Sequence, residues 1–419
     1  MGISTERQWR QPCIFISILL MFASLFISRV MLSVSMIAFL FFTCFHFSFI
    51  QQLRKFINCR LLVAISLLFF IPFLTWFWSD DKLMWARWAR IKLPLFLLPL
   101  AFAGNWQLTP TQWRTIAWCL ILLVFAGCCW SLFYYLKSPF LIQENYLRAK
   151  LMATPLGNDH VRFSLLVCLT VVFCVMLFVS ADEKKSKTAL AILATFFIIY
   201  MHVLSARTGL VGLYIFILAG IIRTIQDFKK NRWILTGTII LLLMPLAAWY
   251  FLPTFQNRFR YILYDFSFIR QQTYLPGSND GSRMFSLRAG WEILKDHPAG
   301  VGSGDVVASA NAWYNSHLPY MIETDKLYPS SEWLLYGDAA GWAGLILFTA
   351  VMLIPFFEKT NLPFFWMIMN LIAGFSFLFD IGLESQYGVF IYAMLVLLMW
   401  KVVKRDKSIV KREWISLQL

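Results

Sequence analysis

The sequence has few charged residues for its length. Only 14% of its 419 residues are Asp, Glu, Lys or Arg, whereas 59% are hydrophobic and 18% are aromatic. Soluble globular domains carry about 25% charged and roughly 45–50% apolar residues. A soluble protein of this length would lack the polar surface to cover its core, so soluble enzymes, disordered proteins and coiled coils are excluded. The composition predicts an all-α protein that crosses a membrane many times.

Motifs for metals and nucleotides are also missing. The eight cysteines lie in or beside apolar runs, without the spacing of a metal site or a disulfide framework. Such cysteines are typically small buried hydrophobic residues. No glycine loop of the Walker or kinase type is present. We therefore expect no metal, no cofactor, and neither ATP-driven transport nor cytoplasmic signalling.

The net charge of +15 is concentrated in short Lys and Arg clusters between apolar runs. A nucleic-acid-binding protein displays basic residues on a soluble face, so no binding to nucleic acid is expected here. Clusters near the N-terminus, at 54–60, at 184–187 and at 223–232 fall on one face, and the tail joins them if the number of spans is even. The positive-inside rule makes that face cytoplasmic, with both termini on it.

Apolar runs long enough to cross a bilayer recur along the chain. A transmembrane helix needs about 20 mostly apolar residues. The first run begins at Pro12 and continues past the apolar core of a signal peptide without a small-residue cleavage site, so we expect a span rather than a cleaved leader. We predict about twelve spans, at 12–28, 30–50, 60–78, 92–106, 114–136, 161–180, 188–205, 208–224, 233–253, 334–356, 362–380 and 386–403.

These spans predict four parts of the chain. Residues 1–253 hold spans one to nine, 254–333 form a large and partly helical outer loop, 334–403 hold the last three spans, and 404–419 form a basic cytoplasmic tail. Loops of such length are usually functional. We therefore expect 254–333 to carry a working site that faces outward.

Arg207 lies at the outer junction of two predicted spans, in the run His-Val-Leu-Ser-Ala-Arg-Thr-Gly. An arginine in such a turn can bind an anion through two parallel hydrogen bonds. It can equally extend its charge to the membrane surface from a merely structural position. The spacing leaves both interpretations open.

Two further segments place polar residues beside apolar helices. The run 278–305 has an Asn-Asp-Gly-Ser turn typical of a helix start, a helical apolar stripe that Pro298 ends, and a glycine-rich turn at 300–304. That turn is either structural or an anion-binding nest. The run 329–345 passes from Ser-Ser-Glu into an apolar helix with Gly-x-x-Gly. Close packing explains its glycines but not Asp338 within the span.

Together these segments resemble the superfamily of O-antigen ligases and O-antigen polymerases, which are bacterial membrane glycosyltransferases with a GT-C-like fold. Arg207 closes a short outer turn, and Arg283 precedes a loop helix that ends in Lys-Asp-His-Pro and Gly-Val-Gly-Ser-Gly-Asp. A polar segment then enters the Gly-x-x-Gly helix, and the run 383–388 is similar to the outer loop before the family's last span. The resemblance covers about residues 190–400.

The resemblance implies an enzyme of the bacterial inner membrane that takes a glycan from undecaprenyl diphosphate at the periplasmic face. Ligases pass it to lipid A-core and polymerases to another carrier-linked glycan, without a metal and with inversion at the anomeric carbon. Arg207 and Arg283 would hold the diphosphate, since guanidinium pairs strongly with phosphate, with Arg288 beside them. His160 and Asp305 are further candidates for contacts with the substrate.

One position departs from the ligase pattern, because Ser330 stands where the family has its histidine. A serine hydroxyl is a poor base at neutral pH, whereas imidazole suits that role. Glu332 and His317 are the leading alternatives for a general base, ahead of Asp325. The departure also leaves open a mechanism without this base or a relative that has lost activity.

A transporter of lipid-linked glycans is the competing class of function. It too needs many spans and cationic groups, but transporters usually show internal repeats or helices broken near the midplane. We find no convincing repeat, and the polar residues gather at one face. This asymmetry favours chemistry at the membrane surface. Ligase and polymerase are not separated by these residues.

Overall fold

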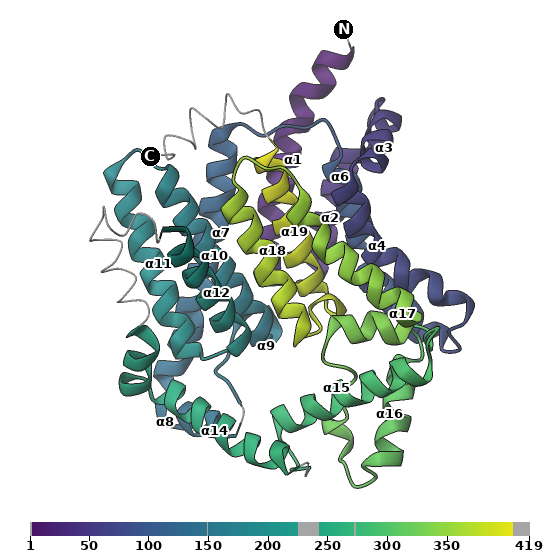
Figure 1. Ribbon diagram of the computed structural model, residues 1–419. Coiled ribbons are helices and arrows are strands. Elements are labelled where there is room, and N and C mark those ends of the chain that lie inside the picture. The colour runs from purple at the N-terminus through teal and green to yellow at the C-terminus, as the bar shows by residue number, and fades with distance from the viewer. Residues whose placement is uncertain (1, 149, 225–242, 272–273, 405–419) are drawn as a thin grey trace. The chain divides into compact units, whose positions relative to one another are not determined.

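The computed structural model describes residues 2–148, 150–224, 243–271 and 274–404, and within these ranges every regular element is a helix (Figure 1). The chain divides into two compact units, each described by itself. Unit 1 comprises Met1–Cys119, Asp265–Thr360 and Ala373–Lys404, and unit 2 takes in Leu120–Tyr264 and Asn361–Ile372.

Among the described residues, seven helices are long and apolar enough to cross a membrane. They are Trp9–Ile27, Arg60–Phe77, Pro110–Lys137, His160–Ser180, Lys184–Leu204, Glu332–Phe357 and Gln386–Val403. An eighth span results if Arg29–Cys44 and Phe49–Asn58, which are bent by 104°, cross together. The prediction of an all-helical protein with many apolar helices is thereby confirmed.

Some predicted spans take another form or lie elsewhere. The predicted span 92–106 contains only the nine-residue helix Pro94–Phe102, and 362–380 contains a shorter apolar helix, Pro363–Leu378. Most of the predicted span 233–253 and nearly all of the basic tail 404–419 lie outside the described residues. The total of about twelve spans and their orientation stay predictions.

Unit 1 holds the helices on which the glycine-rich and Ser-Ser-Glu segments lie. The elements of unit 1 are α1 (Gly2–Ile27), α2 (Arg29–Cys44), α3 (Phe49–Asn58), α4 (Arg60–Leu74), η1 (Thr75–Phe77), α5 (Lys82–Lys92), α6 (Pro94–Phe102), α15 (Asn279–Asp296), α16 (Val306–His317), η2 (Glu323–Asp325), α17 (Glu332–Leu353), η3 (Ile354–Phe357), η4 (Gly382–Glu384) and α19 (Gln386–Val403). Helix α4 packs against α6 and α17. Helix α19 packs against α6 and is buried along nearly all of its length.

Unit 2 is built around α10, which packs against both α11 and α12. Tyr146 joins this group, because its buried hydroxyl donates to the Leu204 carbonyl at 2.9 Å. The elements are α8 (Pro139–Tyr146), α9 (Pro155–Asn158), α10 (His160–Ser180), α11 (Lys184–Leu204) and α12 (Arg207–Thr224), while α7 (Pro110–Lys137), α14 (Pro253–Arg270) and α18 (Pro363–Leu378) are shared with unit 1.

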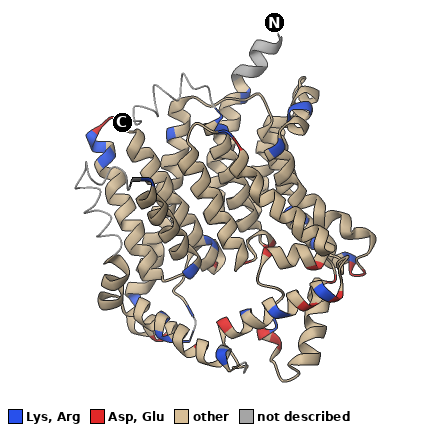
Figure 2. Ribbon diagram, viewed as in Figure 1, with Lys and Arg blue, Asp and Glu red and all other residues tan. Residues whose placement is uncertain are grey.

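Helix α15 begins where the Asn-Asp-Gly-Ser turn predicts. The Ser278 hydroxyl oxygen caps the helix by accepting from the Gly281 N–H at 2.9 Å, as side chains do at helix starts. Pro298 follows its end. One face of α15 packs on α16 around Phe285, Ile293 and other buried residues. Figure 2 shows charges of both signs along α15, in contrast to the apolar α18. The 254–333 region is therefore largely helical and has a small core of its own.

Candidate functional site

The segments singled out in the sequence converge within unit 1. Ser286 on α15 and Ser330 before α17 have their hydroxyl oxygens 2.9 Å apart, and the Ser330 N–H donates to Ser286 Oγ at 3.2 Å. The N–H of Leu383, in η4, donates to the Glu332 carboxylate at 2.5 Å. The loop helix, the start of α17 and the turn before α19 thus form one assembly.

The glycine-rich turn docks on a break in α17. Gly341 has φ +67° and ψ −160°, and a β-carbon there would lie 2.0 Å from the Pro298 carbonyl oxygen. Trp342 N–H donates to that same carbonyl at 3.1 Å, and Gly302 N–H donates to the Ala339 carbonyl at 3.0 Å. Gly341 is therefore required by its conformation and by the close approach of another segment.

The N–H groups of the glycine-rich turn have acceptors within the protein. Ser303 N–H donates to Thr75 Oγ1 at 3.0 Å, and Gly304 N–H donates to Ser79 Oγ at 3.2 Å. Of the two alternatives for 300–304, the structure favours the structural turn, because these N–H groups donate to acceptors of the protein itself. The turn joins α17 to the end of α4.

Asp305 lies directly after this turn. Its carboxylate accepts from the N–H groups of Asp80 at 2.6 Å and Asp81 at 3.0 Å, so it caps the segment that leads into α5. These two hydrogen bonds give Asp305 a structural role. Its predicted contact with a substrate stays a prediction.

A buried ionic cluster closes the start of α17. The side chains of Lys92, Glu332 and Glu384 are 1%, 0% and 4% exposed. The Lys92 ammonium hydrogen-bonds Glu384, lies 4.0 Å from Glu332, and lies 3.3 Å from the Tyr336 hydroxyl. One Glu332 oxygen accepts from the Leu383 N–H, whereas the other faces the Lys92 ammonium without a hydrogen bond from any described residue, and the whole carboxylate is shielded from solvent. Such a carboxylate is poorly placed to take a proton from an acceptor molecule.

Asp338 is a second buried carboxylate in α17. It is fully buried, and neither of its oxygens has a hydrogen-bond partner within the described part of the chain. A β-carbon at Gly290 would lie 3.1 Å from Asp338 Oδ2 and 2.8 Å from two carbons of Pro329. Gly290 therefore keeps open the narrow space between α15 and α17 in which this carboxyl lies.

A second polar cluster, which is partly exposed, joins α15 to α16. Glu292 accepts from Arg288 Nε at 2.9 Å and from Trp313 Nε1 at 2.5 Å. The Nε2 atom of His317 lies 3.7 Å from Glu292 Oε2, and its ring stacks on Trp313 with centroids 4.5 Å apart and planes 14° apart. Two residues predicted for the site, Arg288 and His317, are thus brought together by Glu292. We call these four residues the Glu292 cluster.

The geometry of the Glu292 cluster suits proton transfer. His317 Nδ1 lies 3.0 Å from the Trp313 carbonyl oxygen and 2.9 Å from Ser316 Oγ. In the tautomer whose Nδ1–H donates to that carbonyl, Nε2 carries the lone pair. The His317 side chain is 48% exposed. Burial acts to raise the pKa of Glu292, but hydrogen bonds from Trp313 and Arg288 outweigh it and hold that pKa below its usual value. Glu292 therefore stays ionised beside the imidazole.

The other predicted anion-binding residues lie in different units. Arg283, on α15 in unit 1, donates from Nη1 to the Phe379 carbonyl at 3.3 Å. Arg207 begins α12 and His160 begins α10, both in unit 2. Ser205, in the left-handed conformation with φ +51°, ends α11 and sets the short turn before Arg207. The turn is as predicted, and the shared diphosphate contact stays a prediction.

Sequence reasoning missed Glu292, Trp313, Glu384 and the buried role of Lys92. Arg288 and Glu292 are four residues apart on one helix, as are Trp313 and His317 on the next, and this spacing places each pair on one helix face. That signal was available. Two features depend on tertiary contacts and cannot be predicted from a local sequence pattern. They are the contact between the two helix faces and the burial of a lysine beside two glutamates.

Within the described ranges, no group of three His, Cys, Asp or Glu side chains is arranged to hold a metal ion. The Glu292 cluster brings guanidinium, carboxylate, imidazole and indole groups together on α15 and α16, which are not among the candidate membrane spans. Comparisons of the chain with known protein families and with curated proteins find no match.

Proposed function

We propose that this protein is a membrane glycosyltransferase of the O-antigen ligase type. It would move a glycan from undecaprenyl diphosphate to lipid A-core or another glycan at the outer face of the bacterial inner membrane. The observation that carries the proposal is the convergence of the 278–305, 329–344 and 383–388 segments in unit 1. These three features of the sequence resemblance pack against one another, whereas the Arg207 turn belongs to unit 2.

In this proposal the acceptor hydroxyl loses its proton to His317 Nε2, and its oxygen bonds to the anomeric carbon. The bond from that carbon to the diphosphate oxygen breaks, and undecaprenyl diphosphate leaves with the electron pair. Arg283 and Arg207 bind the diphosphate charge, and Glu292 stabilises the imidazolium that forms. We favour His317 over Glu332 as the base because Glu332 is buried and engaged. Ser330, bonded to Ser286, holds α17 against α15.

The test is glycan transfer by the purified full-length protein, with undecaprenyl-diphosphate-linked sugar, candidate acceptors and EDTA. We expect product from the native protein and from Arg270→Ala, a control at an exposed arginine that ends α14. Arg283→Ala and Arg207→Ala should abolish transfer while the protein stays folded and inserted. Ser330→Ala should cost far less than the loss of a catalytic histidine.

The product distribution separates the variants of the proposal. A single transfer to lipid A-core indicates a ligase, and a ladder of sizes indicates a polymerase. Carrier binding without product for any acceptor would overturn the enzyme assignment. It would favour a silent relative, for which Ser330 in place of the family's histidine is the supporting observation, or a transporter.

A further inference from the structure

The α2–α3 bend is held by a chain of hydrogen bonds. His46 Nε2 lies 2.7 Å from Gln52 Oε1, and its Nδ1 lies 3.1 Å from Ser48 Oγ. The Gln52 amide then donates to the Leu100 carbonyl at 2.7 Å, which ties the bend to α6. The 104° turn between the helices is therefore a built corner, and α3 is held across the direction of α2.

Helix α3 presents an apolar stripe beside a basic edge. Gln52 and Phe56 face the protein, while three apolar side chains at helical spacing point outward and are 67%, 39% and 62% exposed: Ile50, Leu53 and Ile57. Arg54 and Lys55, next to that stripe, are also exposed, and Lys55 hydrogen-bonds Asn105. Such a helix lies in the plane of a membrane interface, with apolar residues among acyl chains and basic residues among headgroups.

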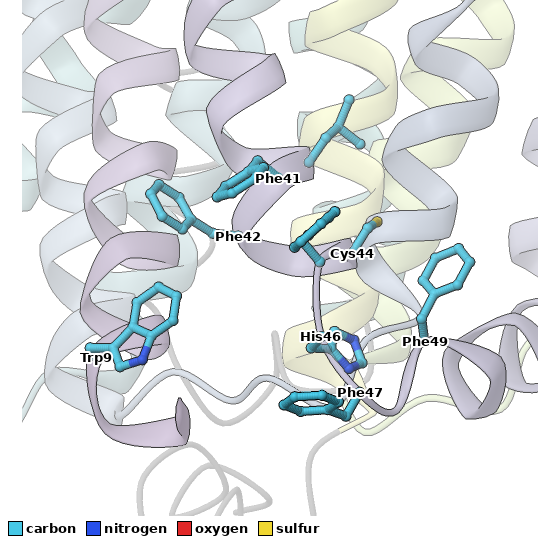
Figure 3. Close-up of a pocket in the computed structure, with 9 residues that line it drawn as sticks. Trp9, Phe41, Phe42, Cys44, His46, Phe47 and Phe49 are labelled. Carbon is cyan, nitrogen blue, oxygen red and sulfur yellow. The ribbon is translucent and has the colours of Figure 1, made fainter. Parts of the chain in front are cut away.

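An aromatic groove of about 750 Å³ opens at the same corner. Figure 3 shows Trp9 of α1 beside Phe41 and Phe42 of α2, with His46 and Phe47 in the segment that follows. Phe47 is 95% exposed. The volume is that of a small-molecule site, and the aromatic lining suits a hydrocarbon chain. We call it the corner groove.

The stretch of sequence that carries the corner groove has charges of one sign. Arg10 Nε donates to the carbonyl of the groove residue Phe42 at 2.8 Å, so a guanidinium lies beside the groove. From residue 7 to residue 79 the sequence has no Asp or Glu, while it has six basic residues: Arg7, Arg10, Arg29, Arg54, Lys55 and Arg60. The excess of basic residues attracts an anionic headgroup. This stretch has no carboxylate that could pair with the cationic group of a zwitterionic lipid.

We propose that the corner groove is a binding site for one phospholipid of the bilayer with an anionic headgroup. An acyl chain lies among the aromatic rings, and the phosphate lies near Arg10 and Arg54. The site is independent of the proposed transferase activity, since none of its residues belongs to the Glu292 cluster or the α15–α17 assembly. Bilayer phospholipid is present at every stage of the protein's life, which suits a groove that would otherwise expose Phe47 and its neighbours to water.

The experiment is photo-crosslinking of the full-length protein in nanodiscs. A trace phospholipid with a photoreactive acyl chain carries either a phosphatidylglycerol or a phosphatidylcholine headgroup, and labelled peptides are mapped by mass spectrometry. We expect phosphatidylglycerol to label peptides with Trp9 or residues 40–49 at least fivefold more than phosphatidylcholine does. Excess unlabelled phosphatidylglycerol should compete in the native protein, whereas phosphatidylcholine should not.

Variants separate the headgroup from the chain. Arg54→Gln/Lys55→Gln should lower phosphatidylglycerol labelling about fivefold, and Phe47→Ser, at an exposed ring, should lower labelling by either lipid. Lys184→Gln/Lys185→Gln removes the same charge from an exposed pair at the start of α11 and should leave labelling of the corner groove unchanged. Size-exclusion profiles check the fold of each variant.

Three results would overturn the proposal. Equal labelling by the two headgroups in the native protein would remove the basis for an anionic ligand. Labelling that Phe47→Ser leaves unchanged would show general contact with bilayer lipid only. Displacement of the phospholipid by an equimolar polyprenyl phosphate would assign the groove to a carrier lipid.

Discussion

Within the described part of the chain, Lys92 is the cation that pairs with Glu332 and Glu384 in the buried cluster. Burying a charged pair is not itself a strong source of stability, but removing one partner leaves an uncompensated charge in the interior. Lys92→Met should therefore lower the free energy of unfolding by about 3–5 kcal/mol. Thermal unfolding in nanodiscs measures the loss. Lys92→Met/Glu384→Gln should recover part of it, and equal stability of the single and double variants would contradict this account.

His317 is the residue on which the proposed chemistry turns. General-base catalysis contributes typically 10²–10⁴-fold, so His317→Ala should lower the transfer rate by about that factor while carrier binding is kept. His297→Ala, at an exposed histidine after α15, is the matched control and should retain its rate. Initial rates at saturating carrier give the comparison. Near-normal transfer by His317→Ala would remove this residue from the mechanism.

Gly290 tests the tight contact between α15 and α17. Gly290→Ala places a β-carbon 2.8 Å from Pro329 and 3.1 Å from Asp338 Oδ2, and overpacking of this kind costs about 1–3 kcal/mol. Gly374→Ala is the control, because a β-carbon there meets nothing within 4 Å. Thermal unfolding of the two variants side by side gives the difference. Equal melting temperatures would mean that the two helices can separate freely.

The sequence predicted candidate residues better than their roles. Imidazole and guanidinium chemistry pointed to His317 and Arg288, which the structure places together. Glu332 met the same chemical criterion, yet it lies within the protein against Lys92. Residue type states what a group is able to do, while its access to solvent is decided by segments far away in the chain.

At the level of elements, the contact between α15 and α16 depends on the charge of Glu292. The folded-state pKa of Glu292 lies below its usual value, because hydrogen bonds from Trp313 and Arg288 outweigh its burial. The stability that this carboxylate contributes is therefore fully present above its ordinary pKa of about 4.5 and is lost as pH falls through the lower folded-state value.

Hydrogen exchange of the α16 amides measures this dependence. In the native protein the protection of α16 should fall below about pH 4.5, the ordinary pKa of Glu292. Glu292→Gln should have lower protection at neutral pH and no further step in acid. Glu323→Gln, at a carboxylate that is 81% exposed in its ion pair, serves as the control. An acid step that persists in Glu292→Gln would assign it to another group.

Helix positions followed from hydropathy, but helix breaks did not. The apolar run 30–50 reads as one span, whereas the chain turns after Cys44 because His46 and Gln52 bond to each other and to α6. The break in α17 at Gly341 arises where the Pro298 carbonyl approaches. In both places a contact with a distant segment overrides the local preference for continuous helix. A hydropathy window covers only neighbouring residues, so it does not include the segment that makes the contact.

For the molecule as a whole, the open prediction is the face on which 254–333 lies. None of the eight native cysteines falls in that stretch, so a single cysteine there gives a distinct labelled peptide. Thr324→Cys should react with a membrane-impermeant maleimide added outside spheroplasts, whereas Lys184→Cys should react only after lysis. Mass spectrometry of the peptides reads the result. The reverse pattern would invert the proposed topology.

The hydrogen bond from Gln52 to Leu100 joins residues 48 positions apart. During synthesis Gln52 is added to the chain 48 residues before Leu100, so its amide cannot form this hydrogen bond until α6 is being made. The angle between α2 and α3 is thus settled by a later segment. A nascent chain halted before Leu100 lacks the carbonyl that holds the corner, and one halted after Phe102 already contains it. The hydrogen bond that holds the bend can therefore form only after α6 has been synthesised.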